Sequence, residues 1–284
     1  MPIDLAPDQL LLAGLIGDPV AHSRSPALHN AAFAQLGLRA RYELWPTPAS
    51  DLAARIESLR APHILGANVT LPHKIAVLEL LDRLDPAVEA IGAANTIIRE
   101  ADGTLTGANT DAPAFLASLR EEAGYDPAGQ TAVILGASGA ARAAALALLG
   151  AGLAQLAVAN RTVERAEALL GDLLAATDSD SRLFALAPDD ADLPELLAEA
   201  TLIVNATSLG WHGDESPLPA ALIPPGALVF DMVYRPTQLL RDAASRGART
   251  LDGAGMLARQ AALAFERWTG LVAPLDIMRA ALHT

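Results

Sequence analysis

Lys74 is the only lysine among the 20 lysine and arginine residues of the chain, and it ends the polar stretch "NVTLPHK". Asn68 and Thr70 lie in the same stretch, which follows a predicted strand. Because α/β proteins bind ligands beyond the carboxyl ends of their strands, these side chains are candidate site residues. An ammonium group can donate or share a proton near neutral pH, whereas a guanidinium group stays charged. A solvated surface lysine is the alternative interpretation.

Asp111 ends a second polar stretch, "GANTD", which also follows a predicted strand. A carboxylate beside an ammonium group in a cleft would hold that group in place. Asp111 also suits the N-cap of the helix predicted to follow it, because aspartate is a favoured capping residue. The two interpretations are compatible.

The segment "GDPVAHSRSPALHN", residues 17–30, indicates an anion site at the exit of the first predicted strand. Ser23 and Ser25 alternate, so in an extended segment both hydroxyl groups would point to one side. Pro26 suits the first turn of a helix, whose N-terminal dipole favours an anion. We therefore expect the serines to bind an anion and His22 and His29 to be structural.

A glycine-containing turn in "VILGASGAARAA" matches the dinucleotide-binding fingerprint, with Ser138 between Gly136 and Gly139 in place of a middle glycine. The helix that follows would direct its N-terminus at the phosphates. After the next predicted strand, "NRT" supplies Asn160 and Arg161 where an NAD site would have an acidic residue for the ribose. An arginine there suits the 2′-phosphate of NADP. A plain glycine turn and a solvent-exposed arginine are the alternatives.

Short apolar runs alternate with alanine- and leucine-rich helical runs along the chain, which predicts an α/β fold with helices on both faces of parallel sheets. The predicted strands include residues 11–17, 40–46, 63–70, 130–135, 153–159, 201–207 and 227–233. We also expect a hairpin around Asp102-Gly103, helices over 25–37 and 72–82, and a domain boundary near Asp111.

The 284 residues carry a net charge of −13 and include no cysteine. The excess negative charge repels nucleic acid and anionic membranes, so we predict neither as a partner. No stretch reads as a membrane span, and the lack of cysteine excludes disulfides and thiolate metal sites. We predict a cytoplasmic protein that binds a small molecule and no metal.

Taken together, the motifs resemble the shikimate dehydrogenase family, which reduces 3-dehydroshikimate reversibly with NADPH in aromatic amino acid biosynthesis. The motifs that carry the resemblance occur in the family's order: "GDPVAHSRSPALHN", "NVTLPHK", "IGAANT", "GANTD", "GASGAARA", "NRT", "NATSLG", "DMVYRP" and "DGAGMLARQAALAFERWTG". The resemblance implies a substrate-binding domain of residues 1–110 and 254–284 and an inserted Rossmann-type NADP-binding domain of residues 111–253. It also implies a monomer or a homodimer.

The resemblance assigns a role to each candidate residue. Lys74 and Asp111 would be the catalytic pair. The substrate would be bound by Ser23, Ser25, Asn68, Thr70, Asn95, Tyr234 and Gln260. NADP would be bound by Gly136, Ser138, Gly139, Ala140, Asn160, Arg161, Thr162, Thr207, Ser208, Met232 and Gly255.

Two other functions stay open. The first is a broader quinate/shikimate dehydrogenase that uses NAD or NADP, because no residue of the sequence settles whether quinate is rejected. The second is a non-catalytic ligand-binding protein of the same fold. Such a protein would be expected to have lost Lys74 or Asp111, and both are present.

Overall fold

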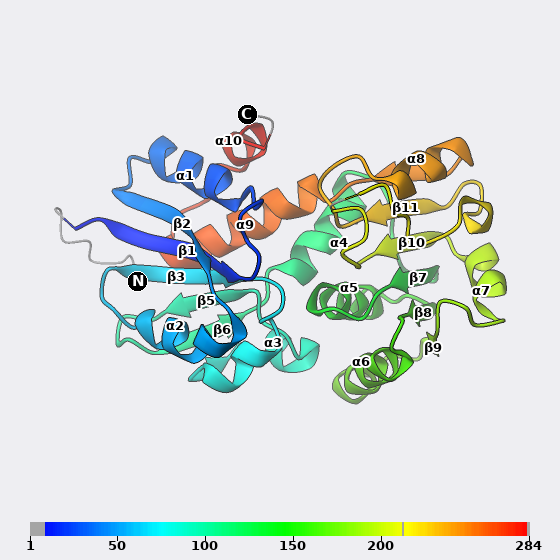
Figure 1. The fold of residues 1–284 in the computed structure, drawn as a ribbon, viewed down its shortest axis with the longest axis horizontal. Helices are drawn as coiled ribbons and strands as arrows, with labels where there is room; N and C mark the ends of the chain where they lie inside the picture. The colour runs from blue at the N-terminus through cyan, green and yellow to red at the C-terminus, as the bar shows by residue number, and fades with distance from the viewer. Residues whose placement is uncertain (1–8, 212, 283–284) are drawn as a thin grey trace. The chain divides into compact units, whose positions relative to one another are not determined.

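The computed structural model describes residues 9–211 and 213–282; residues 1–8, 212 and 283–284 lie outside the described residues. The chain forms two compact units, Met1–Asp111 with Leu257–Thr284 and Ala112–Met256. Helices α4 (Asp111–Glu121) and α9 (Ala254–Thr269) contain the two passages of the chain between the units (Figure 1). The domain limits predicted at 110/111 and 253/254 remain a proposal about domain organisation.

The first unit is built on a six-stranded mixed sheet in the order β2-β1-β3-β5-β6-β4. Its strands are β1 (Leu11–Gly17), β2 (Ala40–Pro46), β3 (Ile64–Val69), β4 (Arg83–Leu84), β5 (Thr96–Arg99) and β6 (Leu105–Ala108). β1 pairs in parallel with β2 and β3, whereas β5 is antiparallel to β3 and β6. The predicted hairpin is confirmed: β5 and β6 flank Gly103, whose positive φ of 85° favours glycine.

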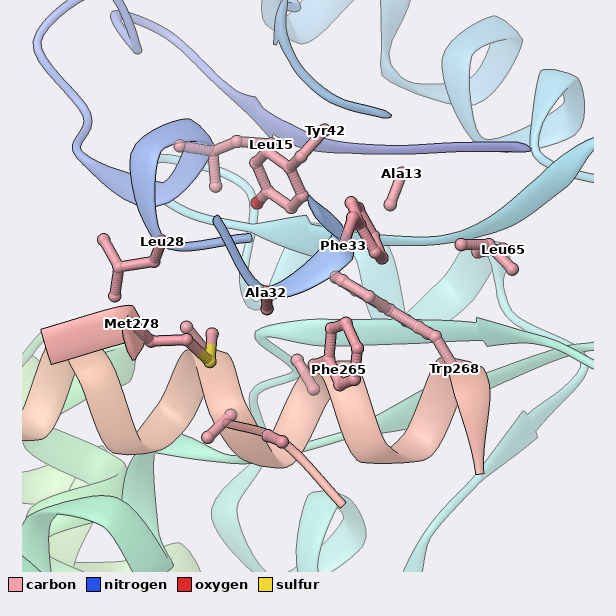
Figure 2. Packing of buried hydrophobic residues seen from close by; sticks show 14 of the residues in the cluster. Ala13, Leu15, Leu28, Ala32, Phe33, Tyr42, Leu65, Phe265, Trp268 and Met278 are labelled. Carbon is pink, nitrogen blue, oxygen red and sulfur yellow. The ribbon is translucent and has the colours of Figure 1, made fainter. Parts of the chain in front are cut away.

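Helices cover both faces of this sheet. They are α1 (Ser25–Gln35), α2 (Leu52–Ser58), α3 (Pro86–Ile91), α9 and α10 (Leu275–Ala280), with 3₁₀ helices η1 (Ala49–Asp51) and η2 (Ala76–Leu80). Phe33 of α1 and Phe265 of α9 belong to a buried cluster that also includes Tyr42 of β2 (Figure 2). Ile56 of α2 and Val88 of α3 belong to a separate buried cluster. Each cluster buries one apolar side of the sheet, which is the arrangement expected for an α/β unit.

The helix predicted over residues 72–82 is wrong. The structure has a turn, the short helix η2, and then β4. Val77 is the only buried residue of η2. Leu81 is already extended, with φ −100° and ψ 147°, and β4 pairs with β6 from Arg83, so the helix is limited to five residues, a length typical of 3₁₀ helices.

The second unit has a six-stranded, fully parallel sheet in the order β12-β11-β10-β7-β8-β9. Its strands are β7 (Thr131–Leu135), β8 (Gln155–Ala159), β9 (Arg182–Leu186), β10 (Leu202–Asn205), β11 (Leu228–Asp231) and β12 (Arg249–Leu251). Its helices are α4, α5 (Gly139–Gly150), α6 (Val163–Ala176), α7 (Leu193–Glu199) and α8 (Gln238–Ser245), with the 3₁₀ helix η3 (Ala220–Leu222).

This strand order is the doubly wound order of dinucleotide-binding domains, in which the first strand, β7, lies at the centre between β8 and β10. The predicted α/β fold class with a Rossmann-type sheet is thereby confirmed. The order also fixes where a ligand would lie, because the chain reverses its direction of winding between β7 and β10. Across the described residues, no helix has both the length and the hydrophobicity to cross a membrane.

Candidate active site

Lys74 and Asp111 form an ion pair in the first unit. Lys74 Nζ donates to Asp111 Oδ2 at 2.5 Å, and the two side chains are only 13% and 7% exposed. Lys74 follows β3, and Asp111 follows β6 as the first residue of α4. β3 and β6 are both antiparallel to β5, which lies between them, so their carboxyl ends share one edge of the sheet. The fold therefore brings the two predicted catalytic side chains together.

Asn95 fixes the other side of the Asp111 carboxylate. Asn95 Nδ2 donates to Asp111 Oδ1 at 2.8 Å and to Thr110 Oγ1 at 2.9 Å. Asn95 Oδ1 accepts from the backbone N–H of Thr110 at 2.8 Å, which fixes the orientation of the amide. A longer contact of 3.4 Å joins Asn95 Nδ2 to Gln260 Oε1 on α9. Both carboxylate oxygens of Asp111 thus have a donor in the protein itself.

Asn68 extends this polar cluster along β3. Its Nδ2 donates to the Asn95 carbonyl oxygen at 3.2 Å and to Thr96 Oγ1 at 3.1 Å. Its Oδ1 accepts from the Tyr42 hydroxyl at 2.9 Å. Thr70 follows β3, and its backbone N–H donates to the Ile16 carbonyl at 2.9 Å. Lys74, Asp111, Asn95, Gln260 and Asn68 therefore form one connected cluster, with Thr70 two residues beyond Asn68 in the chain.

The serine segment is a turn, and the predicted extended geometry is wrong. Ser25 is the first residue of α1, and Arg24 before it already has helical backbone angles, φ −87° and ψ −5°. Ser23 Oγ accepts from the Ser25 N–H at 3.2 Å and donates to Ser25 Oγ at 3.1 Å. A serine hydroxyl often binds the backbone two residues on, which favours a turn over an extended strand. The hydroxyl groups nevertheless lie together at the start of α1, as an anion site requires.

In the second unit, the predicted cofactor residues follow the parallel strands at one edge. Gly136 follows β7 and has a positive φ of 103°, and a Cβ atom there would lie 3.1 Å from the Ala206 carbonyl. Ser138 is the N-cap of α5: its Oγ accepts from the Ala141 N–H at 3.3 Å and donates to the Ala206 carbonyl at 3.0 Å. Ser138 therefore caps the helix and ties it to the loop after β10, two contacts that a glycine could not make. Gly139 and Ala140 begin α5.

The predicted NADP-selecting segment follows the neighbouring strand β8. Asn160 Nδ2 donates to the Thr162 carbonyl at 2.7 Å, which closes a tight turn. Arg161, inside this turn, is exposed to solvent. An exposed guanidinium beyond a strand end can reach a phosphate without the cost of burying its charge first.

Asn205 and Asp231 were missed in the sequence, and they organise the loops that carry Thr207, Ser208 and Met232. The two side chains are fully buried at the ends of β10 and β11, with Asn205 Nδ2 donating to Asp231 Oδ1 at 2.9 Å. Asn205 Oδ1 accepts from the N–H and the hydroxyl of Thr207 at 3.0 and 2.7 Å. Burial raises the pKa of Asp231, although hydrogen bonds from Thr237, Val233 and Asn205 partly oppose that rise.

Two further predicted residues lie in the second unit. The Tyr234 ring meets Trp211 edge-on with 4.7 Å between ring centroids. Gly255 lies in the first turn of α9, where a Cβ atom would clash with the Glu122 carboxylate. A role for Tyr234 at the substrate and for Gly255 at the cofactor remains a prediction. Within the described residues, no three histidine, aspartate or glutamate side chains gather as a metal site would require.

Comparison with known proteins identifies the family. Residues 15–97 match the shikimate dehydrogenase substrate binding domain, residues 116–210 match shikimate/quinate 5-dehydrogenase, and residues 253–283 match the shikimate 5′-dehydrogenase C-terminal domain. The shikimate dehydrogenase (NADP(+)) of Moorella thermoacetica is 48% identical over 271 residues, which cover 94% of this chain and 90% of that protein. The chain belongs to the shikimate dehydrogenase family. The resemblance inferred from the motifs is thus confirmed.

Solved structures agree with this assignment. Shikimate 5-dehydrogenase from Thermus thermophilus, in complex with NADP(H) and shikimate, superposes with a TM-score of 0.84 at 42% identity, covering 96% of this chain and 98% of that one. Quinate dehydrogenase from Corynebacterium glutamicum, in complex with NAD, superposes with a TM-score of 0.87 at 32% identity, covering 97% and 99%. The fold alone therefore accommodates either cofactor and either substrate, so specificity depends on the individual side chains.

Proposed function

We propose that this chain catalyses the reversible reduction of 3-dehydroshikimate to shikimate, with Lys74 and Asp111 as its catalytic pair. The observation that carries the proposal is the largely buried Lys74–Asp111 ion pair, fixed from the far side by Asn95. A cationic donor and a fixed carboxylate at one sheet edge can together bind and protonate a carbonyl oxygen.

The reaction class follows from the family. The chain is an oxidoreductase with NADP as its cofactor, as predicted, and its place is in aromatic amino acid biosynthesis. When bound in its reduced form, the cofactor would supply the hydride that the carbonyl carbon accepts. The protein then has to bind the substrate, orient it and provide the proton.

The second unit has the features that an NADP phosphate group needs. The positive φ of Gly136 and the Ala206 carbonyl, 3.1 Å from where a Cβ atom would lie, suit glycine alone and allow the tight turn that leads into α5. The N-terminus of α5, which has 12 residues, begins three residues later and carries the positive end of the helix dipole. Arg161 would hold the 2′-phosphate and so favour NADP over NAD.

Lys74 would donate its proton to the carbonyl oxygen as that oxygen gains negative charge. Asp111 would keep Lys74 in place and would accept a hydrogen bond from the new hydroxyl once the oxygen is protonated. Because Asn95 holds Oδ1 and Lys74 holds Oδ2, the carboxylate needs no reorientation when substrate arrives. In the oxidation direction the roles reverse, with Lys74 receiving the hydroxyl proton.

The remaining polar residues would orient the substrate ring. Ser23 and Ser25, with the start of α1 behind them, suit the carboxylate. Asn68, Thr70, Asn95 and Gln260 suit the ring hydroxyls, and the family resemblance assigns Tyr234 to the carboxylate. Arg24 lies between the serines in the chain, but its guanidinium donates to the Leu282 carbonyl oxygen at 3.1 Å.

A second candidate is a quinate/shikimate dehydrogenase that also uses NAD, and the likeness to a quinate dehydrogenase in complex with NAD favours keeping it. A non-catalytic binding protein of this fold is less consistent with the intact Lys74–Asp111 pair. The deciding experiment measures kcat/KM for shikimate and quinate, each with NADP and NAD. We expect the shikimate–NADP combination to dominate. A preference for NAD would refute the role of Arg161, and a lack of turnover in all four combinations would refute the enzyme.

The cellular and quaternary setting is part of the same proposal. We infer a cytoplasmic protein, because a chain without cysteine forms no disulfides and does not depend on an oxidising compartment to fold. A monomer or a homodimer is expected, and sedimentation equilibrium of the purified protein distinguishes the two. Binding of nucleic acid is not expected because of the net charge.

A further inference from the structure

Tyr42 is a buried residue next to the substrate-binding groups that has no place in the mechanism so far. It lies on β2, the edge strand, and is 2% exposed. Its hydroxyl donates to Asn68 Oδ1 at 2.9 Å, across the intervening strand β1. The Tyr42 hydroxyl thus touches Asn68 at the proposed ring-hydroxyl site.

A continuous chain of hydrogen bonds leads from Tyr42 to the catalytic carboxylate. Asn68 Nδ2 donates to Thr96 Oγ1 at 3.1 Å, and Thr96 Oγ1 donates to Asn95 Oδ1 at 3.0 Å. Asn95 Nδ2 then donates to Asp111 Oδ1 at 2.8 Å. Each amide nitrogen donates and each amide oxygen accepts, the Thr96 hydroxyl accepts once and donates once, and the chain starts at the Tyr42 hydroxyl. By donating to Asn68 Oδ1, Tyr42 helps to fix which way the Asn68 amide faces.

The protein holds the Tyr42 ring independently of any ligand. The His29 ring stacks on it with 4.3 Å between centroids and 5° between planes, and Trp268 packs against it at 6.1 Å. Figure 2 shows Tyr42 together with Phe33 of α1 and Trp268 of α9 in this packing. Asn30 binds the backbone of Tyr42 on both sides, accepting from its N–H at 2.8 Å and donating to its carbonyl at 3.1 Å. Helix α1, which begins at Ser25, therefore also sets the position of Tyr42.

Burial keeps both rings of this stack neutral. It raises the pKa of Tyr42 well above the ordinary value, so the hydroxyl stays a donor at every physiological pH. It lowers the pKa of His29 to about 3, with an interaction with the Asn68 side chain only partly opposing this. Within the described part of the chain, neither ring nitrogen of His29 has a hydrogen-bond partner of ordinary geometry, so His29 acts as an aromatic support.

We propose that Tyr42 is a positioning residue for substrate binding, whose hydroxyl fixes the orientation of the Asn68 amide. The proposal rests on the proposed function, since Asn68 is there a substrate ligand. With Asn68 Nδ2 committed to Asn95 and Thr96, Asn68 presents its carbonyl oxygen to the substrate, as an acceptor for a ring hydroxyl. If Tyr42 only filled the core, substrate binding would not depend on its hydroxyl.

The test is Tyr42→Phe, which removes the hydroxyl and keeps the aromatic ring. The matched control is Tyr125→Phe, because the Tyr125 hydroxyl has a similar hydrogen bond to Thr201 Oγ1 at 2.9 Å in the second unit. We expect Tyr42→Phe to raise the KM for shikimate roughly tenfold, with a change in kcat of less than about threefold and no change in the KM for NADP. Tyr125→Phe should leave all three constants as in the wild type.

A double variant tests whether Tyr42 acts through Asn68. In an Asn68→Ala background, Tyr42→Phe should raise the KM much less than it does alone. If Tyr42→Phe does not fold, Asn30→Ala, which frees the Tyr42 backbone and keeps its hydroxyl, should raise the KM for shikimate in its place. An unchanged KM in the folded variant, or an equal rise for NADP, would overturn the proposal. Loss of shikimate turnover in the wild type itself would instead refute the proposed function.

Discussion

Removing either partner of the Lys74–Asp111 pair should lower both the turnover and the stability of the protein. The informative variants are Lys74→Met, which keeps the length of the side chain, and Asp111→Asn, which keeps its shape. Both partners touch the reacting oxygen in the proposed mechanism, so each single variant should lower kcat by roughly two to four orders of magnitude. Because the two act as one unit, the double variant should be slower than the worse single variant by less than about tenfold.

The stability effect follows from the geometry of the pair. The two groups are 2.5 Å apart and 13% and 7% exposed. Breaking a buried pair from one side costs roughly 3–5 kcal/mol, because an unpaired charge stays behind. The Lys74 end retains some contact with water, so we expect about 2–3 kcal/mol for each single variant. The double variant leaves no unpaired charge and should regain most of this, ending within about 1 kcal/mol of the wild type.

Urea unfolding measures these free energies, with emission from Trp45 and Trp268 as the probe because both lie buried in the first unit. Steady-state turnover of shikimate with NADP measures kcat for the same preparations. If the losses in log kcat simply add in the double variant, the two residues do not act as one unit. If the single variants unfold at the wild-type urea concentration, the pair is not buried as described.

Lys74→Arg separates proton donation from electrostatic stabilisation. Arginine keeps the positive charge but does not release a proton in this range of pH. If Lys74 is a proton donor, Lys74→Arg should be about as slow as Lys74→Met. Recovery to within about tenfold of the wild type would show that charge alone suffices.

Three further perturbations test other parts of the account. Arg161→Ala should raise the KM for NADP about tenfold and leave the KM for NAD unchanged, as kinetics with both cofactors would reveal. Burial raises the pKa of Asp231 above its ordinary 3.8, so its contribution to stability is full below pH 3.8 and is lost as the pH rises through the raised value. Asp231→Asn should therefore become more stable relative to the wild type as the pH rises above about 4, in urea unfolding at several pH values. The pKa of His29 falls from 6.5 to about 3 on folding, so stability is full above pH 6.5 and declines as the pH falls from there toward 3. The decline should be about 1.4 kcal/mol per pH unit within this window, and His29→Phe should abolish that part of it.

The sequence allowed the local features of the fold and site to be predicted. The glycine turn at Gly136 and the hairpin at Gly103 depend on backbone conformations that few other residues adopt, and the structure has both. Lys74 stood out because no other lysine occurs in the chain. Each glycine signal depends only on its immediate neighbours in the chain, and the lysine signal depends only on composition.

Features that depend on tertiary packing could not be predicted in this way. The α-helix expected over residues 72–82 is cut short because β4 pairs with β6 from Arg83, and that pairing with Thr106 is not visible in the local sequence. Tyr42 reads as an ordinary strand residue, since Asn68 is 26 positions away in the sequence. The same separation of 26 residues hides the contact between Asn205 and Asp231. Buried polar pairs between strands that are far apart in the sequence leave no local sequence pattern.

The most direct test of the central claim is to incubate the purified protein with shikimate and NADP and to identify both products. NADPH should form together with an equimolar ketone, lighter than shikimate by two hydrogens. The same preparation of Lys74→Met should form both products far more slowly while remaining folded. Wild-type protein that binds shikimate and NADP but forms neither product would contradict the account.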